Sequence, residues 1–110
     1  MEVPGAKKNL AAVMFYEAFG TALLVVGFNW TYGNGPLLHV LGYAMTYLAL
    51  YSFAGPISGG HFNPALTLAV LLQKGLSNDN LFCAFGMIFC QFIGGSIGGF
   101  ITRMGYKIDY

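Results

Sequence analysis

The sequence contains three long apolar stretches, at about residues 10–32, 37–54 and 81–102. At a rise of ~1.5 Å per residue, a helix of such length crosses a hydrocarbon layer of ~30 Å, although the second stretch is slightly short. Only one charged residue, Glu17, falls inside these stretches. Of the 110 residues, 8% are charged, whereas a soluble domain usually carries about 25%. The sequence therefore predicts an all-α, multi-pass integral membrane protein.

The pattern changes between the second and third stretches. Residues 55–62 contain three glycines and a proline, and Asn63-Pro64-Ala65 follows directly. The next apolar run stops near Lys74-Gly75, so it has about half the length of a membrane crossing. Asparagine is a favoured helix cap, proline favours the first turn, and a cation followed by glycine suits a helix end. Residues 55–74 are therefore predicted to form a re-entrant loop and a half-helix whose N-terminus points into the bilayer.

The third stretch carries a repeated pattern of small residues. Four of its glycines form two overlapping pairs with a spacing of four residues, Gly94 with Gly98 and Gly95 with Gly99. Small residues at this spacing let two membrane helices approach closely. We expect this part of the third span to pack tightly against another helix.

Other features argue against an enzyme, a metal site and a nucleic-acid partner. The sequence shows no pairing of nucleophile and base, no carboxylate pair and no phosphate-binding loop, so no catalytic function and no cofactor are expected. His39 and His61 lack partners at metal-ligand spacing. The net charge of +1 provides no basic patch that could neutralise phosphates.

Three motifs make the chain resemble the major intrinsic protein family, the aquaporins and aquaglyceroporins. The family's first Asn-Pro-Ala loop is similar to residues 58–70, SGGHFNPALTLAV, and the context of the tripeptide makes this match specific. Its first and third helices are similar to residues 16–27, YEAFGTALLVVG, and 90–99, CQFIGGSIGG. The family's usual plan has six spanning helices built from two inverted repeats. The resemblance thus implies that residues 1–110 form a single aquaporin-like half domain of the N-terminal type, and no second Asn-Pro-Ala occurs in them.

The resemblance also implies roles for the residues of the loop. The backbone carbonyls that would line the pore belong to Gly59, Gly60, His61 and Phe62. The motif itself consists of Asn63, Pro64 and Ala65. The side-chain NH₂ of Asn63 would donate to a passing water or hydroxyl oxygen while its oxygen caps the half-helix. The half-helix N-terminus carries roughly half a positive charge, which would repel cations and protons.

Three residues outside the loop resemble functional positions of the family. Glu17 and Gln91 match residues that brace the loop, and for Glu17 this structural role is favoured over proton transport. Tyr43 falls at or near the second-helix aromatic of the family's selectivity filter, although an ordinary packed or interfacial tyrosine is an equal alternative. The arginine of that filter has no counterpart, because Leu66 follows Ala65.

Two functions fit these expectations. The first is one half of a channel for passive transport of water or a small neutral solute, completed by a second aquaporin-like half from the same or a different chain. Insertion in both orientations is permitted by a weak bias of basic residues, with Lys7, Lys8 and Lys74 on one side and Arg103 and Lys107 on the other. The second function is a non-conducting accessory subunit of a larger membrane complex, for which the mitochondrial inner membrane is one candidate location.

Overall fold

The computed structural model describes residues 9–105, which form α-helices and one short 3-10 helix. The elements are α1 (Leu10–Thr31), η1 (Tyr32–Asn34), α2 (Pro36–Ser58), α3 (Pro64–Lys74) and α4 (Asn78–Gly105). In length and apolar character α1, α2 and α4 are sufficient to cross a membrane, and α3 is a shorter apolar helix. The expected fold class, an all-α membrane protein with three spans and a half-helix, is confirmed. Lys7, Lys8 and Lys107 lie outside the described residues.

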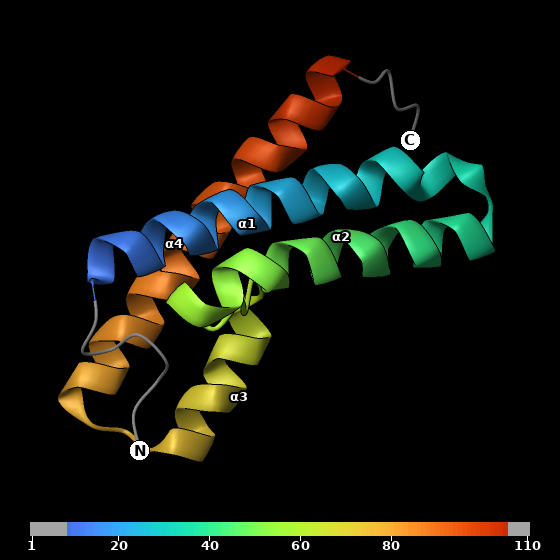
Figure 1. Ribbon diagram of the computed structural model, residues 1–110. Helices are drawn as coiled ribbons and strands as arrows, with labels where there is room; N and C mark the ends of the chain where they lie inside the picture. The colour runs from blue at the N-terminus through green and yellow to red at the C-terminus, as the bar shows by residue number, and fades with distance from the viewer. Residues whose placement is uncertain (1–8, 106–110) are drawn as a thin grey trace.

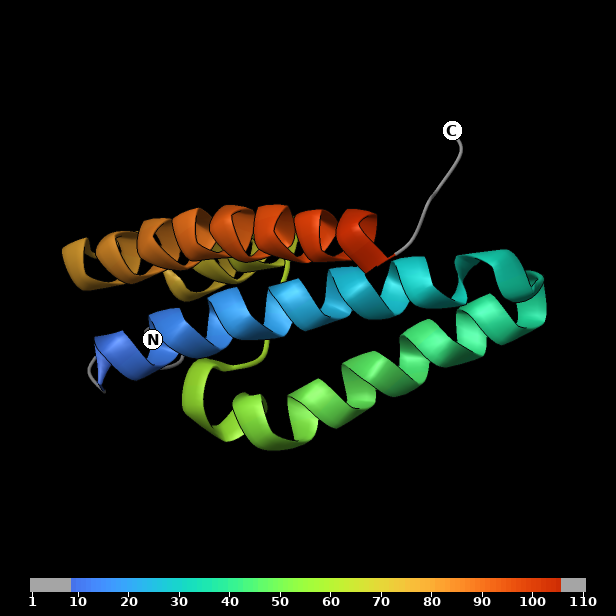
Figure 2. The same ribbon diagram turned by 90° about the horizontal axis from the view of Figure 1, so that it is seen from above.

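The helix α1 lies between α2 and α4. It packs along both of them, α2 and α4 do not pack on each other, and α3 packs on α4. Figure 2 shows this layering, with α1 (blue to cyan) between α4 (orange to red) and α2 (green). Figure 1 shows α3 (yellow) leading from the end of α2 back to the start of α4. The α1–α2 turn and the α3–α4 turn consequently lie at opposite ends of the molecule (Figure 2).

Two glycines of α4 bring it into close contact with α1. A Cβ atom added at Gly94 would overlap the backbone carbonyl of Ala18, and one at Gly98 would overlap that of Ala22. Gly95 makes only ordinary contact with α1, and nothing lies within 4 Å of a Cβ built at Gly99. The close approach of α4 to α1 therefore depends on the pair Gly94 and Gly98, because a side chain at Gly95 or Gly99 would meet no backbone of α1.

The second span is longer than the sequence indicated. We expected it to end at residue 54, before Gly55 and Pro56, but α2 continues to Ser58 with Pro56 inside it. A proline removes only its own N–H, and the next turn still closes, with the Gly59 N–H donating to the Gly55 carbonyl at 2.9 Å. The chain leaves the helix only at Gly59, whose φ of 89° is left-handed.

The half-helix α3 begins and ends where its flanking residues predict. Asn63 is the N-cap and Pro64 the first helical residue, while Lys74 occupies the last turn and Gly75 follows with a φ of 112°. The next helix is capped by Ser77, whose hydroxyl oxygen accepts from the Asn80 N–H at 3.2 Å. These local signals set the length of α3 at half a span.

Large apolar side chains cover much of the outer surface of the described residues. On α4 they include Phe82, Phe85, Phe89 and Phe92, and α2 is the least covered of the three spans. One small interior cluster comprises Val13, Leu71, Cys83, Ala84 and Met87, and a second comprises Leu24, Leu50, Ala54 and Phe62. An outer surface of this kind suits lipid or another polypeptide as its neighbour, since water would solvate it poorly.

Candidate functional site

The loop between α2 and α3 contains several residues in the left-handed backbone region. Gly59 and Gly60 have φ values of 89° and 63°, which glycine adopts at little cost. Phe62 also has a positive φ, 55°, which is uncommon for a residue with a side chain. Its ring packs over Gly20, where a Cβ atom would overlap it, and stands edge-on to Tyr47 at a centroid distance of 5.8 Å. Packing of the ring between α1 and α2 thus holds Phe62 in an otherwise unfavourable conformation.

Glu17 joins α1 to the loop and to α4. Its carboxylate is fully buried, and each of its oxygens accepts two hydrogen bonds. Oε1 accepts from the Ser58 hydroxyl at 2.7 Å and from the His61 backbone N–H at 3.1 Å. Oε2 accepts from the Phe62 backbone N–H at 2.8 Å and from Gln91 Nε2 at 2.8 Å. These four donors satisfy both oxygens of the buried carboxylate.

A second group of hydrogen bonds connects α4, α3 and the loop. Gln91 Nε2 also donates to Thr67 Oγ1 at 2.8 Å, and Thr67 Oγ1 lies 3.0 Å from His61 Nδ1. All three side chains are buried. The amide of Gln91 is oriented by its two acceptors, and its Oε1 has no hydrogen-bond partner among the described residues. The structure therefore brings Glu17, Gln91 and His61 together beside the loop.

Asn63 stands at the start of α3 with its side chain exposed. Its Oδ1 accepts from the Ala65 N–H at 2.9 Å, and its backbone carbonyl accepts from the Thr67 N–H at 3.0 Å. No residue in the described part of the chain accepts a hydrogen bond from its Nδ2. A free N–H donor therefore lies beside the positive end of the α3 dipole.

Sequence reasoning missed three hydroxyl groups that hold the loop. Ser58 and Thr67 lie within the loop motif, but only the folded chain reveals that their hydroxyls contact Glu17 and Gln91. Tyr47 donates to the Gly60 carbonyl at 2.8 Å and to the His61 carbonyl at 3.3 Å. Two of the carbonyls expected to face the pore are thus also bonded to a tyrosine. The sequence signal that could have found Tyr47 is its spacing of four residues from Tyr43, because this spacing puts both rings on one face of α2.

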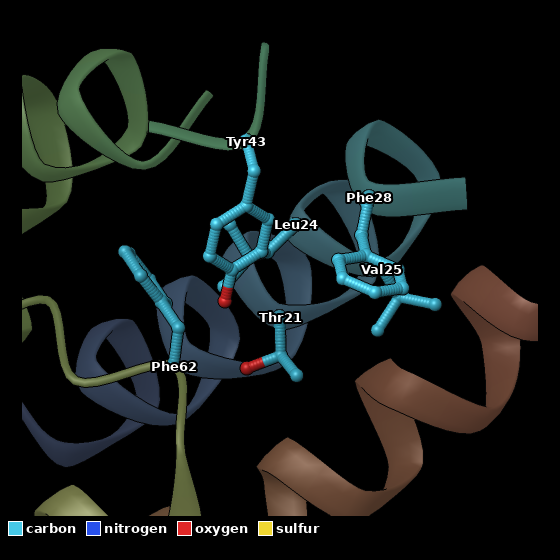
Figure 3. A pocket seen from close by; sticks show the side chains of 6 residues that line it. All are labelled: Thr21, Leu24, Val25, Phe28, Tyr43 and Phe62. Atoms are coloured by element: carbon cyan, nitrogen blue, oxygen red, sulfur yellow. The ribbon is translucent and has the colours of Figure 1, made fainter. Parts of the chain in front are cut away.

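Tyr43 lies at the wall of a cavity of about 240 Å³. The other lining residues are Thr21, Leu24, Val25, Phe28 and Phe62. Figure 3 shows the Tyr43 hydroxyl pointing into the space between α1, α2 and the loop, on the side of Thr21. The structure therefore places Tyr43 next to the loop through Phe62, the residue that directly precedes Asn63.

No three His, Cys, Asp or Glu side chains within residues 9–105 are arranged to hold a metal ion. The site consists instead of backbone groups, hydroxyls, amides and one buried carboxylate around a bent loop. A loop of this kind, leading into a half-helix between spanning helices, defines a membrane protein of the re-entrant-helix class.

Comparison with known proteins identifies the family within this class. The model of the major intrinsic protein family matches residues 7–108. This chain belongs to the major intrinsic protein family, as its motifs suggested. The proteins of this family are channels rather than enzymes, and the chain is a multi-pass integral membrane protein.

Several characterised proteins are similar to the chain. Glycerol uptake facilitator protein-like 6 of Lactiplantibacillus plantarum is 35% identical over 94 residues, covering 78% of this chain and 38% of that protein. Human aquaporin-5 is 32% identical over 103 residues, covering 84% of this chain and 38% of that protein. Human lens fiber major intrinsic protein is 41% identical over 76 residues, covering 66% of this chain and 27% of that protein. The chain thus spans well under half the length of these relatives. No solved structure gives a significant match.

Proposed function

We propose that this chain forms one half of a membrane channel, and that a second aquaporin-like half completes the pore. The channel would let water or a small neutral solute pass down its gradient. The observation that carries this proposal is the state of Asn63, whose Oδ1 is used as a helix cap while its Nδ2 remains free on an exposed side chain. The names of the similar proteins, which include aquaporins and a glycerol uptake facilitator-like protein, are in keeping with both kinds of solute.

The position of Asn63 suits a neutral permeant. Its Nδ2 offers a hydrogen bond to an oxygen that has lost part of its hydration. The positive end of the α3 dipole beside it opposes the passage of cations and protons. The buried bonds from Glu17 to the backbone of His61 and Phe62 hold the loop at a fixed position relative to α1.

The proposal requires a second half because the polar loop needs a protein neighbour at membrane depth. An exposed Asn63 and the carbonyls of the loop would be costly in lipid, where each unsatisfied polar group costs several kcal/mol. The least covered span, α2, adjoins the loop and leaves room for such a neighbour. A second copy in the opposite orientation, or a different half, would restore the inverted repeat of the family.

The conduction proposal can be tested in liposomes. Purified protein should increase osmotic shrinkage over empty vesicles, and Asn63→Asp should reduce the increase severalfold. The aspartate keeps the cap oxygen but replaces the donor by a negative charge. Asn9→Asp is the matched control, because Asn9 also caps a helix through its Oδ1, on Ala12 N at 3.2 Å, and lies outside the loop. No increase over empty vesicles, with correct insertion verified, would rule out a channel made of this chain alone.

The alternative, a non-conducting accessory subunit, makes a different prediction for the native mass. A particle that contains only two or four copies of this chain in mild detergent counts against it. A larger particle with unrelated subunits, together with inactive liposomes, would favour it over the channel.

A further inference from the structure

The loop between α2 and α3 uses its N–H groups and its carbonyl groups on different partners. The N–H groups of His61 and Phe62 donate to the Glu17 carboxylate on α1. The carbonyls of Gly60 and His61 instead accept from the hydroxyl of Tyr47 on α2, at 2.8 and 3.3 Å. The loop is therefore held by α1 through its donors and by α2 through its acceptors.

The four carbonyls expected along the pore are consequently not equivalent. In the part of the chain that the structure describes, the carbonyls of Gly59 and Phe62 accept no hydrogen bond. Those of Gly60 and His61, which lie between them in the sequence, share the single hydroxyl hydrogen of Tyr47. A solute that moves along this row would find the two middle acceptors already bonded to the protein.

Two tyrosine rings also cover this part of the loop. The rings of Tyr47 and Tyr51 are stacked, with centroids 6.5 Å apart and planes at 13°. A Cβ atom added at Gly60 would overlap the ring of Tyr51. A carbonyl oxygen can accept a second hydrogen bond, but the two rings limit the approach of a donor from the side of α2.

Tyr47 also borders open space. A groove of about 530 Å³ on the outer face of α2 is lined by Tyr43, Ala44, Tyr47, Leu48 and Tyr51. Tyr47 thus has the loop carbonyls at its hydroxyl and the groove along its ring, and it is only half-buried. Side chains with an exposed face change rotamer on a timescale of picoseconds to nanoseconds. The groove therefore gives the Tyr47 ring room to leave the carbonyls and to return.

We propose that Tyr47 restrains permeation by holding the middle of the carbonyl row. The inference rests on the channel function proposed above and identifies a residue that limits its rate. A passing water molecule or solute hydroxyl must displace the Tyr47 hydroxyl before it can donate to Gly60 or His61. The side chain thus competes with the permeant for the same two acceptors.

This competition determines the sign and the size of the effect. The net contribution of one neutral hydrogen bond changes an equilibrium or a rate roughly two- to tenfold. Removal of the Tyr47 hydroxyl should therefore raise the permeability by about this factor. A purely structural role predicts the opposite sign, because loss of a bond that only shapes the loop would lower the permeability.

The test measures water permeability in liposomes for the parent protein and three single variants, with insertion and thermal unfolding temperature checked for each. Tyr47→Phe removes only the hydroxyl and should raise the permeability roughly two- to tenfold over the parent. Tyr47→Leu also removes the ring, should raise it at least as much, and provides the test if Tyr47→Phe does not insert. Tyr51→Phe is the matched control, because the Tyr51 hydroxyl forms no hydrogen bond within the described residues. Its permeability should equal that of the parent.

The outcomes separate this inference from the proposed function. If the parent conducts and a correctly inserted Tyr47→Phe conducts equally well or less, the inference is wrong and the channel function stands. A gain at Tyr51→Phe as large as at Tyr47→Phe would also overturn the inference, since only Tyr47 bonds to the loop carbonyls. Absence of permeability in all four proteins, with insertion verified, would overturn the proposed homomeric channel and the inference with it.

Discussion

The carboxylate of Glu17 is fully buried and meets only hydrogen-bond donors. Two of these donors are consecutive backbone N–H groups of the loop, at His61 and Phe62. A buried charge is tolerated when every acceptor site is used in this way, and it becomes costly when a partner is removed. The loop therefore depends on a residue more than forty positions earlier in the chain.

Replacement of Glu17 tests this dependence at the scale of one residue. Glu17→Gln keeps the shape but turns an NH₂ group toward donors, so each donor left unsatisfied should cost about 1–3 kcal/mol. We expect a lower thermal unfolding temperature in detergent. Asp79→Asn is the control, because it removes the same charge from an exposed residue in the first turn of α4, where the cost should stay below about 1 kcal/mol. Equal effects of the two variants would contradict a special role for Glu17.

Thr67 offers a second test, because a matched threonine exists in the same protein. Thr67→Val should leave His61 Nδ1 without its partner and weaken the contact of Gln91, at a cost of about 1–3 kcal/mol in the free energy of unfolding. Thr102→Val also removes a buried hydroxyl, but that group donates only to the Gly98 carbonyl of its own helix at 2.8 Å. Chemical unfolding of both variants measures the difference. A loss at Thr102→Val as large as at Thr67→Val would argue against the network.

At the scale of the elements, the contact between α1 and α4 determines where Glu17 and Gln91 meet. Gly94 lies one turn from Gln91 and lets the backbone of α4 approach Ala18, which directly follows Glu17. The absence of a side chain at Gly94 thus brings the carboxylate and the amide within hydrogen-bond distance. The helix packing and the loop geometry are therefore coupled.

A pair of alanine variants on α4 tests this coupling. Gly94→Ala should force α4 away from Ala18 and cost about 1–3 kcal/mol, the usual penalty of overpacking. Gly99→Ala meets nothing within 4 Å, so the better helix propensity of alanine should stabilise α4 by about 0.5–1 kcal/mol. Thermal unfolding in detergent measures the change in stability of both variants. Destabilisation by Gly99→Ala as well would indicate that this face packs against another helix in the assembly.

At the scale of the whole molecule, the structure leaves its polar loop to be covered from outside. Asn63 is exposed, α2 is little covered, and the α1–α2 and α3–α4 turns mark opposite ends. If two copies pair as an inverted repeat, the two copies must insert into the membrane in opposite orientations. The weak charge bias of the sequence permits such insertion.

Labelling of single cysteines can test the dual orientation. Gly33→Cys and Leu76→Cys place a thiol at the two opposite ends, in a background in which Cys83 and Cys90 are alanine. Gly33 has open space around it and Leu76 is exposed, so neither change should disturb the fold. A membrane-impermeant maleimide applied to intact vesicles should label a part of each variant. Complete labelling of one and none of the other would contradict pairing between copies and require a different second half.

The sequence alone determined the elements and the family. The lengths of the apolar runs gave the three spans, Asn63-Pro64 and Lys74-Gly75 bounded the half-helix, and the loop motif indicated the major intrinsic protein family. These features are local, because caps, helix breakers and apolar length act within a few residues of each other. The end of α2 was the exception, since a single proline near a helix end did not stop it.

Only the tertiary structure decided which groups meet. The partners of Glu17 lie on the loop and on α4, the ring of Phe62 is buried against Gly20, and Gly99 faces away from α1 although Gly98 does not. These facts depend on the angle and distance at which α1 crosses its neighbours, and no periodicity within one helix encodes them. The apolar wall around Tyr43 likewise exists only because α1, α2 and the loop come together.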